Sequence, residues 1–488
     1  MKVFKTLFPA MVLVTLAAGN LFASHYDYLT DLSAEWIAGP NRLAVTDSAD
    51  AAAYNPAGTA FMKDGLYVNV SNQTILNYYG AEVDSAYPGP TDYESHKASP
   101  LVPNGYLVYK QDNWAAFGAV NILCGGGSLS YANGLPSVNE AVRMAATSGL
   151  YGNTSGSLGE NIIGSTTAIF TNAEMALMAA GTPDGAMLTK LTSSKLAGGI
   201  NVDQKSMGIA PSVGGSYRLS DMVSVSLGAR YISMMKRSIA TFVRGGNNGI
   251  DVKLLDVELT ADGLAGIVGT DIKPTENLNI GISLESPTKL EYTVDVKTDL
   301  SYQQRVSKAN GNTDGGKFRF DLPAKLNLGA EYNVTDNFKV MLSGIYYFSK
   351  WMKMEKLDSA GNRVNLTEKT HSYEIGTGFE WKFMQNVAWT GGVVWDYINQ
   401  PENQTSDALY KNECINIGTG FSIYPNDKTK FTVGFMRNIY PDLERKNGAV
   451  VNNGIPTGIP TITPETKYDM KYHKESWVVA VGMQYNFM

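Results

Sequence analysis

The sequence predicts an all-β protein, a 14-stranded antiparallel β-barrel that spans a membrane. Three observations support this fold class. From Leu66 onward, segments of about 10 to 15 residues alternate apolar residues with small or polar ones, as barrel strands do. The connections between these segments alternate between tight turns and longer loops. Aromatic residues collect near the segment ends, where the two membrane interfaces would lie.

The composition excludes several other classes of protein. The 488 residues include 40 Lys and Arg against 46 Asp and Glu, for a net charge of −6, so no nucleic-acid partner is expected. Charged residues make up 18% of the chain, below the roughly 25% of soluble domains. The cysteines, Cys124 and Cys414, and four scattered histidines provide no disulfide scaffold and no metal site. No cofactor and no catalytic residue are predicted.

Residues 1–23 have the pattern of a secretory signal peptide. Lys2 and Lys5 precede an apolar run from Leu7 to Ala18, and Ala23 offers a cleavage point. The run is shorter than the roughly 20 residues that a transmembrane helix needs. We therefore expect Sec-type export and a location in the bacterial outer membrane, in contact with its lipids.

The barrel is expected over residues 66–488. Its strand count is even, as in bacterial single-chain barrels. The expected strands are 66–80, 98–110, 114–126, 206–219, 222–237, 249–273, 277–296, 317–333, 337–354, 370–384, 387–399, 411–424, 429–442 and 476–487.

Strand parity assigns each residue to the lipid or to the lumen. In the last strand the outward set is Trp477, Val479, Val481, Met483, Tyr485 and Phe487. Around Pro323 the outward set is Leu322, Ala324, Leu326, Leu328, Ala330 and Tyr332, while Lys325 faces inward. A soluble β-sandwich fits less well, because its second face would carry Lys, Glu and Thr in place of so much Gly, Ser and Asn.

A short motif precedes the first strand. Asp47 can cap an alanine-rich helix, and Pro56 pushes Asn55 out of helical geometry. The run Asn55-Pro56-Ala57-Gly58, after a signal peptide and before a barrel, resembles the FadL family of outer-membrane transporters of long-chain fatty acids and other hydrophobic compounds. The C-terminal Gly482-x-x-Tyr485-x-Phe487 resembles the signal that barrel-assembly machinery reads, although this chain ends one residue later, at Met488.

The resemblance implies a functional scheme. Residues 24–65 would form a plug inside the barrel, and a single chain would transport its ligand passively. Outer loops would capture the ligand, an internal apolar pocket would hold it, and it would leave sideways through a gap at a kinked third strand. The plug would be held by polar contacts of Asp47, Asp50 and Asn55 with lumen-facing cations and backbone groups.

Three glycines follow Cys124 near the end of the expected third strand. Gly125, Gly126 and Gly127 tolerate backbone angles that other residues avoid, so a strand could bend inward there and leave its neighbour unpaired. The freed backbone groups would then need other partners, since lipid offers none. Two alternatives remain open: the run begins the long loop, or the kink lies earlier, near Gly118.

Residues 128–204 form a connection far longer than the 12 to 15 residues at which a loop starts to need a function. Two capping boxes, at Ser137 and Thr171, open short helical stretches. Flexible thioether side chains suit an adaptable apolar surface, and the alternative is a lid that packs on itself. The candidate ligand-binding residues are Val142, Met144, Met175, Met178, Met187 and Leu188.

A fatty-acid carboxylate would need a cation in an otherwise apolar lumen. Arg230 and Lys325 face the lumen by parity and are the candidates. The alternative is that such cations pair with carboxylates of the wall or plug. The sequence does not choose between a fatty acid and an aromatic hydrocarbon as substrate.

The predicted function is passive transport of long-chain fatty acids or similar hydrophobic compounds. One alternative is a general or adhesive porin that keeps the plug. Another is a lipid hydrolase at the rim, with Ser349 as nucleophile and His371 as base, although no third orienting group is evident.

Overall fold

A computed structural model describes residues 30–87, 91–132, 134–136, 200–242, 252–297, 312–358, 360–366, 370–398, 413–452 and 465–487. The predicted signal peptide and the loop residues Val142, Met144, Met175, Met178, Met187 and Leu188 lie outside these ranges. Among the described residues, no helix is long and apolar enough to cross a bilayer.

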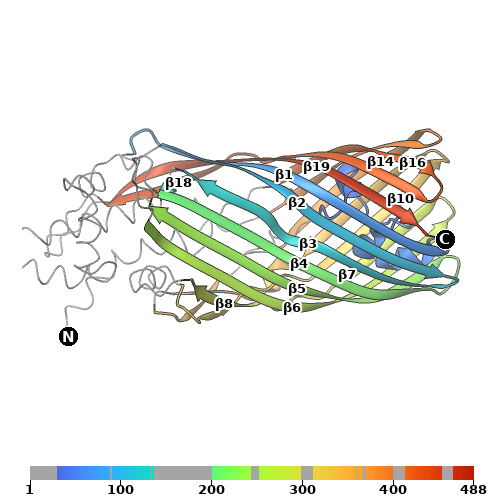
Figure 1. The fold of residues 1–488 in the computed structure, drawn as a ribbon, viewed down its shortest axis with the longest axis horizontal. Coiled ribbons are helices and arrows are strands. Elements are labelled where there is room, and N and C mark those ends of the chain that lie inside the picture. Colours follow the sequence, from blue (N-terminus) through green and yellow to red (C-terminus); the bar gives the residue numbers. More distant parts are fainter. Residues whose placement is uncertain are drawn as a thin grey trace, which may run out of the picture.

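The described strands form one closed antiparallel barrel, as predicted (Figure 1). Its ring has 14 strand positions. The first and last walls close it, since β1 pairs with β19 along its length. Twelve of these positions are each occupied by a single strand: β1 (Gly65–Val83), β2 (Asp92–Gln111), β3 (Trp114–Tyr131), β4 (Ile200–Arg218), β5 (Val223–Phe242), β6 (Val252–Thr275), β11 (Phe338–Tyr347), β14 (Ser372–Met384), β15 (Val387–Tyr397), β16 (Cys414–Asn426), β17 (Thr429–Ile439) and β19 (Glu465–Asn486).

Each of the two remaining positions is occupied by two short strands with a break between them. One consists of β7 (Leu278–Glu285) followed by β8 (Glu291–Val296), and the other of β9 (Lys317–Arg319) followed by β10 (Lys325–Thr335). Short extra strands lie toward the end with the long connections, where β18 (Leu443–Asn452) pairs with β19, and β12 (Met354–Leu357) pairs with β13 (Arg363–Leu366). A 3₁₀ turn, η4 (Ser349–Trp351), precedes β12.

The third strand is longer than expected. β3 continues to Tyr131, and β4 begins at Ile200, so both ends of the expected loop at 128–204 belong to strands. The glycine run therefore lies inside β3 and does not begin the loop.

Strand parity is correct for most of the barrel surface. Trp477, Val479, Val481 and Phe487 are exposed, whereas Val478 and Ala480 are buried. The outward assignment of Leu322 was wrong, because its side chain is fully buried. The face of the chain reverses at Pro323, so Leu322 points inward while Leu328 and Tyr332 point outward as expected.

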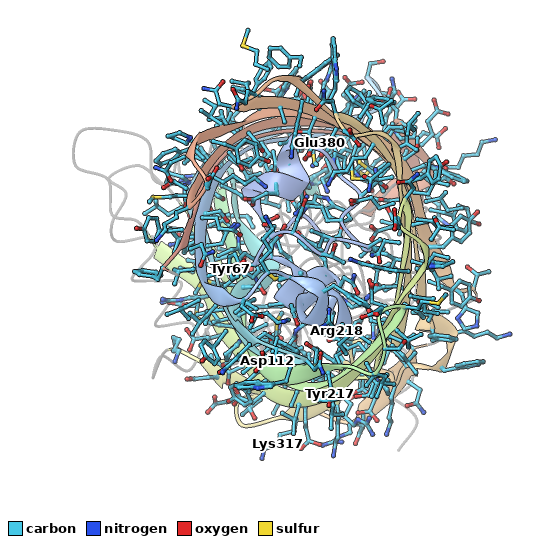
Figure 2. The ribbon with its side chains drawn as sticks, turned by 90° about the vertical axis from the view of Figure 1, so that its right-hand side faces the viewer. Tyr67, Asp112, Tyr217, Arg218, Lys317 and Glu380 are labelled. Carbon is cyan, nitrogen blue, oxygen red and sulfur yellow. The ribbon has the colours of Figure 1, made fainter. Side chains whose placement is uncertain are left out.

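The N-terminal segment fills the lumen near the tight turns. It contains α3 (Ala34–Ala38), α4 (Ala51–Tyr54) and the 3₁₀ helix η3 (Pro56–Phe61). Figure 2 shows these helices inside the ring of strands. Ser33 begins α3 by accepting a hydrogen bond from the Trp36 amide at 3.0 Å. We call residues 30–64 the plug.

The lumen changes character along its length. On β5 the inward residues near the turn end are polar, with Ser224, Ser226 and Arg230 buried. Further along the same face, Ile232 and Met234 are buried, followed by Lys236, Ser238 and Ala240. The polar half surrounds the plug. We call the part toward the long connections the apolar half, because most of its buried side chains belong to one hydrophobic cluster, although it also contains Lys236 and Ser238.

Candidate functional site

The plug motif is fixed to the wall by amide groups. Asn55 ends α4 with φ −142° and ψ 70°, outside helical geometry, as predicted from the proline that follows it. Its Nδ2 donates to Val45 O at 3.1 Å and to the Asp271 carboxylate of β6. Asn279 of β7 donates to the same carboxylate at 3.0 Å and to Ala44 O at 2.8 Å. Two amides thus share one buried acid.

Gly58 is required by this arrangement. A Cβ at position 58 would overlap Asn55 Nδ2 and lie 2.5 Å from Val45 O. We expect Gly58→Ala to destabilise plug docking by about 1–3 kcal/mol, because the interior has no room to relax. Limited proteolysis of the plug in detergent measures the effect. Gly105→Ala is the control, since a Cβ there would meet only Asn69 O at 4.0 Å. Equal cleavage of both variants would contradict this role.

Asp50 forms its ion pair with a residue of the plug, and not with a residue of the barrel strands. Arg42 Nε and Nη2 donate to its two oxygens at 2.6 and 3.0 Å, and both residues are buried. Burial would raise the pKa of the Asp50 carboxyl, but the Arg42 guanidinium outweighs it, so this pKa lies below its ordinary value. Asp50 therefore holds the plug's own fold, which differs from the wall contact expected for it.

Asp47 does reach the wall. Its carboxylate lies 3.2 Å from Lys339 Nζ of β11, which also lies 3.1 Å from Glu331 and 3.7 Å from Glu380. One cation therefore joins the plug to three strands, β10, β11 and β14.

The plug also bridges the closing seam of the barrel. Glu35 Oε1 accepts from Asn69 of β1 at 3.0 Å and from Thr432 of β17 at 3.3 Å. Gln484 of β19 accepts from the Ala49 amide at 2.7 Å and from the Ser48 hydroxyl at 3.1 Å. These contacts fix the plug to both the first and the last strand.

Arg230 and Lys325 meet on one wall carboxylate. Arg230 Nη1 lies 2.6 Å from Glu285 Oε2, and Lys325 Nζ lies 3.4 Å from the same atom. All three side chains are buried at the boundary between the polar and apolar halves of the lumen. The structure therefore brings the two candidate cations together, around an acid that the sequence analysis did not single out.

β2 and β3 part near the middle of the barrel. They pair from Gln111↔Trp114 to Gly105↔Val120, after which β2 pairs only with β1 among the described strands. The pairing of β3 with β4 shifts register at Ile122/Cys124 and again at Gly125/Gly127. Gly125 has φ +72°, and a Cβ there would overlap Ser206 O of β4. Pairing at Gly118, in contrast, is regular.

Side chains satisfy the backbone where the two strands separate. Asn104 Oδ1 of β2 accepts from the Ile122 amide at 3.2 Å and from Asn121 Nδ2 at 3.1 Å. Further along, Ser95 Oγ accepts from the Ser130 amide at 2.8 Å. Because lipid cannot hydrogen-bond these groups, such contacts make the separation tolerable in a membrane.

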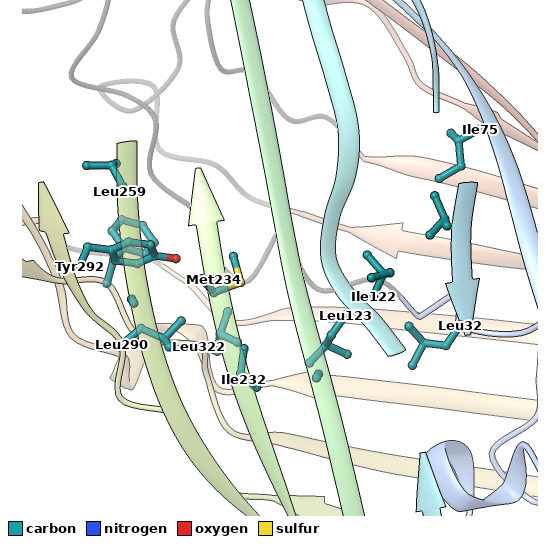
Figure 3. Packing of buried hydrophobic residues seen from close by; sticks show 14 of the residues in the cluster. Leu32, Ile75, Ile122, Leu123, Ile232, Met234, Leu259, Leu290, Tyr292 and Leu322 are labelled. Atoms are coloured by element: carbon teal, nitrogen blue, oxygen red, sulfur yellow. The ribbon is translucent and has the colours of Figure 1, made fainter. Parts of the chain in front are cut away.

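Apolar side chains fill the lumen behind this separation. One continuous buried cluster extends from β3 to β8 (Figure 3). It includes Leu32, Ile75, Ile122, Leu123, Ile232, Met234, Leu259, Leu290, Tyr292 and Leu322. The chemistry of this region suits a hydrocarbon, which would exchange water for apolar contacts.

The residues considered for a hydrolase do not form a pair. Ser349 is fully buried, and its hydroxyl donates to Tyr347 O at 3.4 Å. The His371 ring packs against Tyr346, Phe348 and Trp351. Within the described ranges, no hydrogen bond joins Ser349 to His371, and no group of His, Cys, Asp or Glu could hold a metal ion.

Together these features define a plugged transport barrel of the bacterial outer membrane. The chain belongs to the family of outer-membrane transport proteins known as OMPP1/FadL/TodX, whose model matches residues 138–487. No curated protein matches the chain by sequence.

Solved structures share the fold. A FadL homologue from Pseudomonas aeruginosa is 13% identical with a TM-score of 0.61, and the match covers 95% of this chain and 100% of the homologue. The toluene transporter TbuX of Ralstonia pickettii is 14% identical with a TM-score of 0.53, and coverage is 93% and 97%. One structure of the toluene transporter TodX of Pseudomonas putida is 11% identical with a TM-score of 0.51, and coverage is 89% and 92%.

Proposed function

We propose that the protein carries long-chain fatty acids or similar hydrophobic compounds across the outer membrane by passive diffusion. The outer loop captures the ligand, the apolar half of the lumen holds it, and it leaves sideways between β2 and β3. The observation that carries this proposal is the separation of these two strands beside a buried apolar cluster.

A sideways exit follows from the physical setting. The plug fills the turn end of the lumen with buried polar groups, so an apolar molecule that moved along the axis would have to displace them. A path between β2 and β3 avoids the plug and leads from apolar side chains toward the membrane. Gly125, Gly126 and Gly127 permit the bend that opens this path.

The proposed substrates differ in their head group, which is a carboxylate in a fatty acid and absent in an aromatic hydrocarbon. Two cations, Arg230 and Lys325, lie beside Glu285 at the boundary between the polar and apolar halves, which supports a carboxylate head group that approaches them there. The toluene transporters of the same fold support uncharged aromatic compounds as well.

Gly125→Ala tests the exit. A side chain at this φ is strained and collides with Ser206 of β4, so the bulge in the β3–β4 pairing cannot persist. We expect β3 to straighten and to narrow its gap from β2. We expect uptake of oleate into cells to fall by about tenfold or more, a barrier increase of about 1.4 kcal/mol, while equilibrium binding to the purified protein is unchanged.

Gly118→Ala is the matched control, because it makes the same change in the same strand where pairing is regular and the nearest atom to the new Cβ is Ser212 O at 3.6 Å. Uptake by Gly125→Ala equal to that by Gly118→Ala, in folded protein, would move the exit away from these glycines.

A further inference from the structure

Two prolines face each other at the breaks between β7 and β8 and between β9 and β10. Glu285 pairs with Lys325 on one side of the break, and Thr288 pairs with Leu322 on the other. Counting inward from both pairs places Pro287 opposite Pro323. Beyond the break, Tyr292 pairs with Phe318 in the same register, so neither strand gains a residue on the other. Both strands are therefore broken at the same height.

The break reverses the faces of both strands together. Before it, Glu285 and Lys325 are the buried lumen residues, at odd positions. Beyond it, the fully buried residues are at even positions: Thr288, Leu290 and Leu322. The pairing with the neighbouring strand β6 shows an extra residue at the break. Between the pairs Ile267↔Glu285 and Thr260↔Thr293, β6 spans 267 − 260 = 7 residues, whereas the chain from β7 to β8 spans 293 − 285 = 8. The extra residue is a bulge.

Hydrogen bonds hold the broken segments in place. Thr288 and Leu322 exchange backbone bonds at 3.0 Å in both directions. Ser286 exchanges two bonds with the Gly266 backbone at 2.9 Å, one of them through its hydroxyl. The Leu290 amide donates to Asp321 Oδ1 at 3.2 Å. Since a backbone group without a partner is costly at membrane depth, these bonds make the break a fixed feature of the wall.

The segment 286–290 is pressed into the lumen. A Cβ at Gly263 of β6 would overlap Thr288 Cγ2 and lie 2.7 Å from Lys289 O. The segment thus lies against the lumen face of β6 at a position where only glycine leaves room. A strand bulging inward at this place narrows the lumen.

Apolar side chains occupy the narrowed level. Figure 3 shows Leu290 and Leu322 beside Ile232 and Met234 on one side, and Ile122, Leu123 and Leu32 on the other. All of these belong to the same contiguous buried cluster, which includes β3 residues next to the strand separation. A ligand that crosses this level would contact these side chains.

We propose that the break at Pro287 and Pro323 forms a constriction that selects ligands by cross-section, with Leu290 and Leu322 as the residues that determine specificity. This inference rests on the proposed function. Unbranched hydrocarbon chains pass by displacing one side chain at a time, whereas rigid polycyclic compounds need the whole level to open and are held back by a wall fixed through its backbone.

Uptake of hexadecane and of pyrene tests the constriction, in cells that lack their own channel for hydrophobic compounds. Both probes are uncharged, so the cations at Glu285 do not affect the comparison. We expect the double variant Leu290→Ala/Leu322→Ala to raise pyrene uptake by about tenfold and to leave hexadecane uptake within about twofold. Leu328→Ala is the control, because Leu328 is on β10 but faces the lipid.

If the double variant does not reach the membrane folded, Met234→Ala, on β5 on the same side of the lumen, replaces it, with the same expected direction. An unchanged ratio of pyrene to hexadecane uptake in the folded variant, with normal hexadecane entry, overturns the constriction alone. Absence of uptake of oleate, toluene and hexadecane by the unaltered protein overturns the proposed function.

Discussion

Asp50→Asn should release the plug. The substitution removes the only partner that the two nitrogens of Arg42 contact within the described ion pairs, and leaves a buried cation. Breaking a buried pair in this way typically costs about 3–5 kcal/mol, which is comparable with the whole stability of a small folded unit. We expect the plug to be displaced in a large fraction of molecules, and single-channel conductance in planar bilayers to rise.

Asp112→Asn is the matched control, since Asp112 lies exposed in a tight turn and asparagine tolerates its positive φ of 51°. Conductance of Asp50→Asn equal to that of the control would show that the Arg42 pair does not hold the plug.

The same pair sets a pH dependence. The pKa of Asp50 is lower in the folded protein than its ordinary value, so its contribution to stability is present above that ordinary value and lost as the pH falls through the folded pKa. The unaltered plug should therefore stay closed from about pH 8 to about pH 5 and open only below about pH 4. This titration should be absent in Asp50→Asn.

Glu285→Gln should destabilise the barrel itself. Arg230 and Lys325 would then lie buried without the carboxylate that joins them, at an expected cost of about 3–5 kcal/mol. Unfolding by guanidinium in detergent micelles, followed by circular dichroism, measures the change.

Two further variants make this test specific. Glu276→Gln changes an exposed acid in the turn between β6 and β7 and should be nearly neutral. Adding Lys325→Met to Glu285→Gln removes one of the two cations and should recover part of the loss. If Glu285→Gln were as stable as Glu276→Gln, the three-residue cluster would not be a structural element of the wall.

Alternation along the strands predicted the barrel, its 14 strand positions and the side, lipid or lumen, that most residues face. It could do so because lipid on one side and a crowded lumen on the other impose opposite chemistry on successive residues. The rule failed at Leu322, where parity was carried through Pro323 without a change of face. A proline in a strand signals a bulge or an edge, and Pro287 with Pro323 provided that signal.

Pairing of charges was less accessible from the sequence than strand direction. Asp47 meets a wall cation as expected, but Asp50 pairs with Arg42 eight residues away, within the plug. Glu285, Lys339 and Asn104 were not singled out, because their partners are distant in the chain and depend on barrel register. The parity of Glu285 in its strand would have placed it in the lumen, but not beside both Arg230 and Lys325.

The contacts of the plug with β1 and β19 bear on how the chain assembles. The plug is synthesised first and β19 last, yet Gln484 of β19 satisfies the Ala49 amide and Asn69 of β1 satisfies Glu35. These hydrogen bonds of the plug can all be present only when β19 lies beside β1 and closes the barrel. A chain in which β19 has not yet paired with β1 therefore leaves the Ala49 amide without its partner from β19.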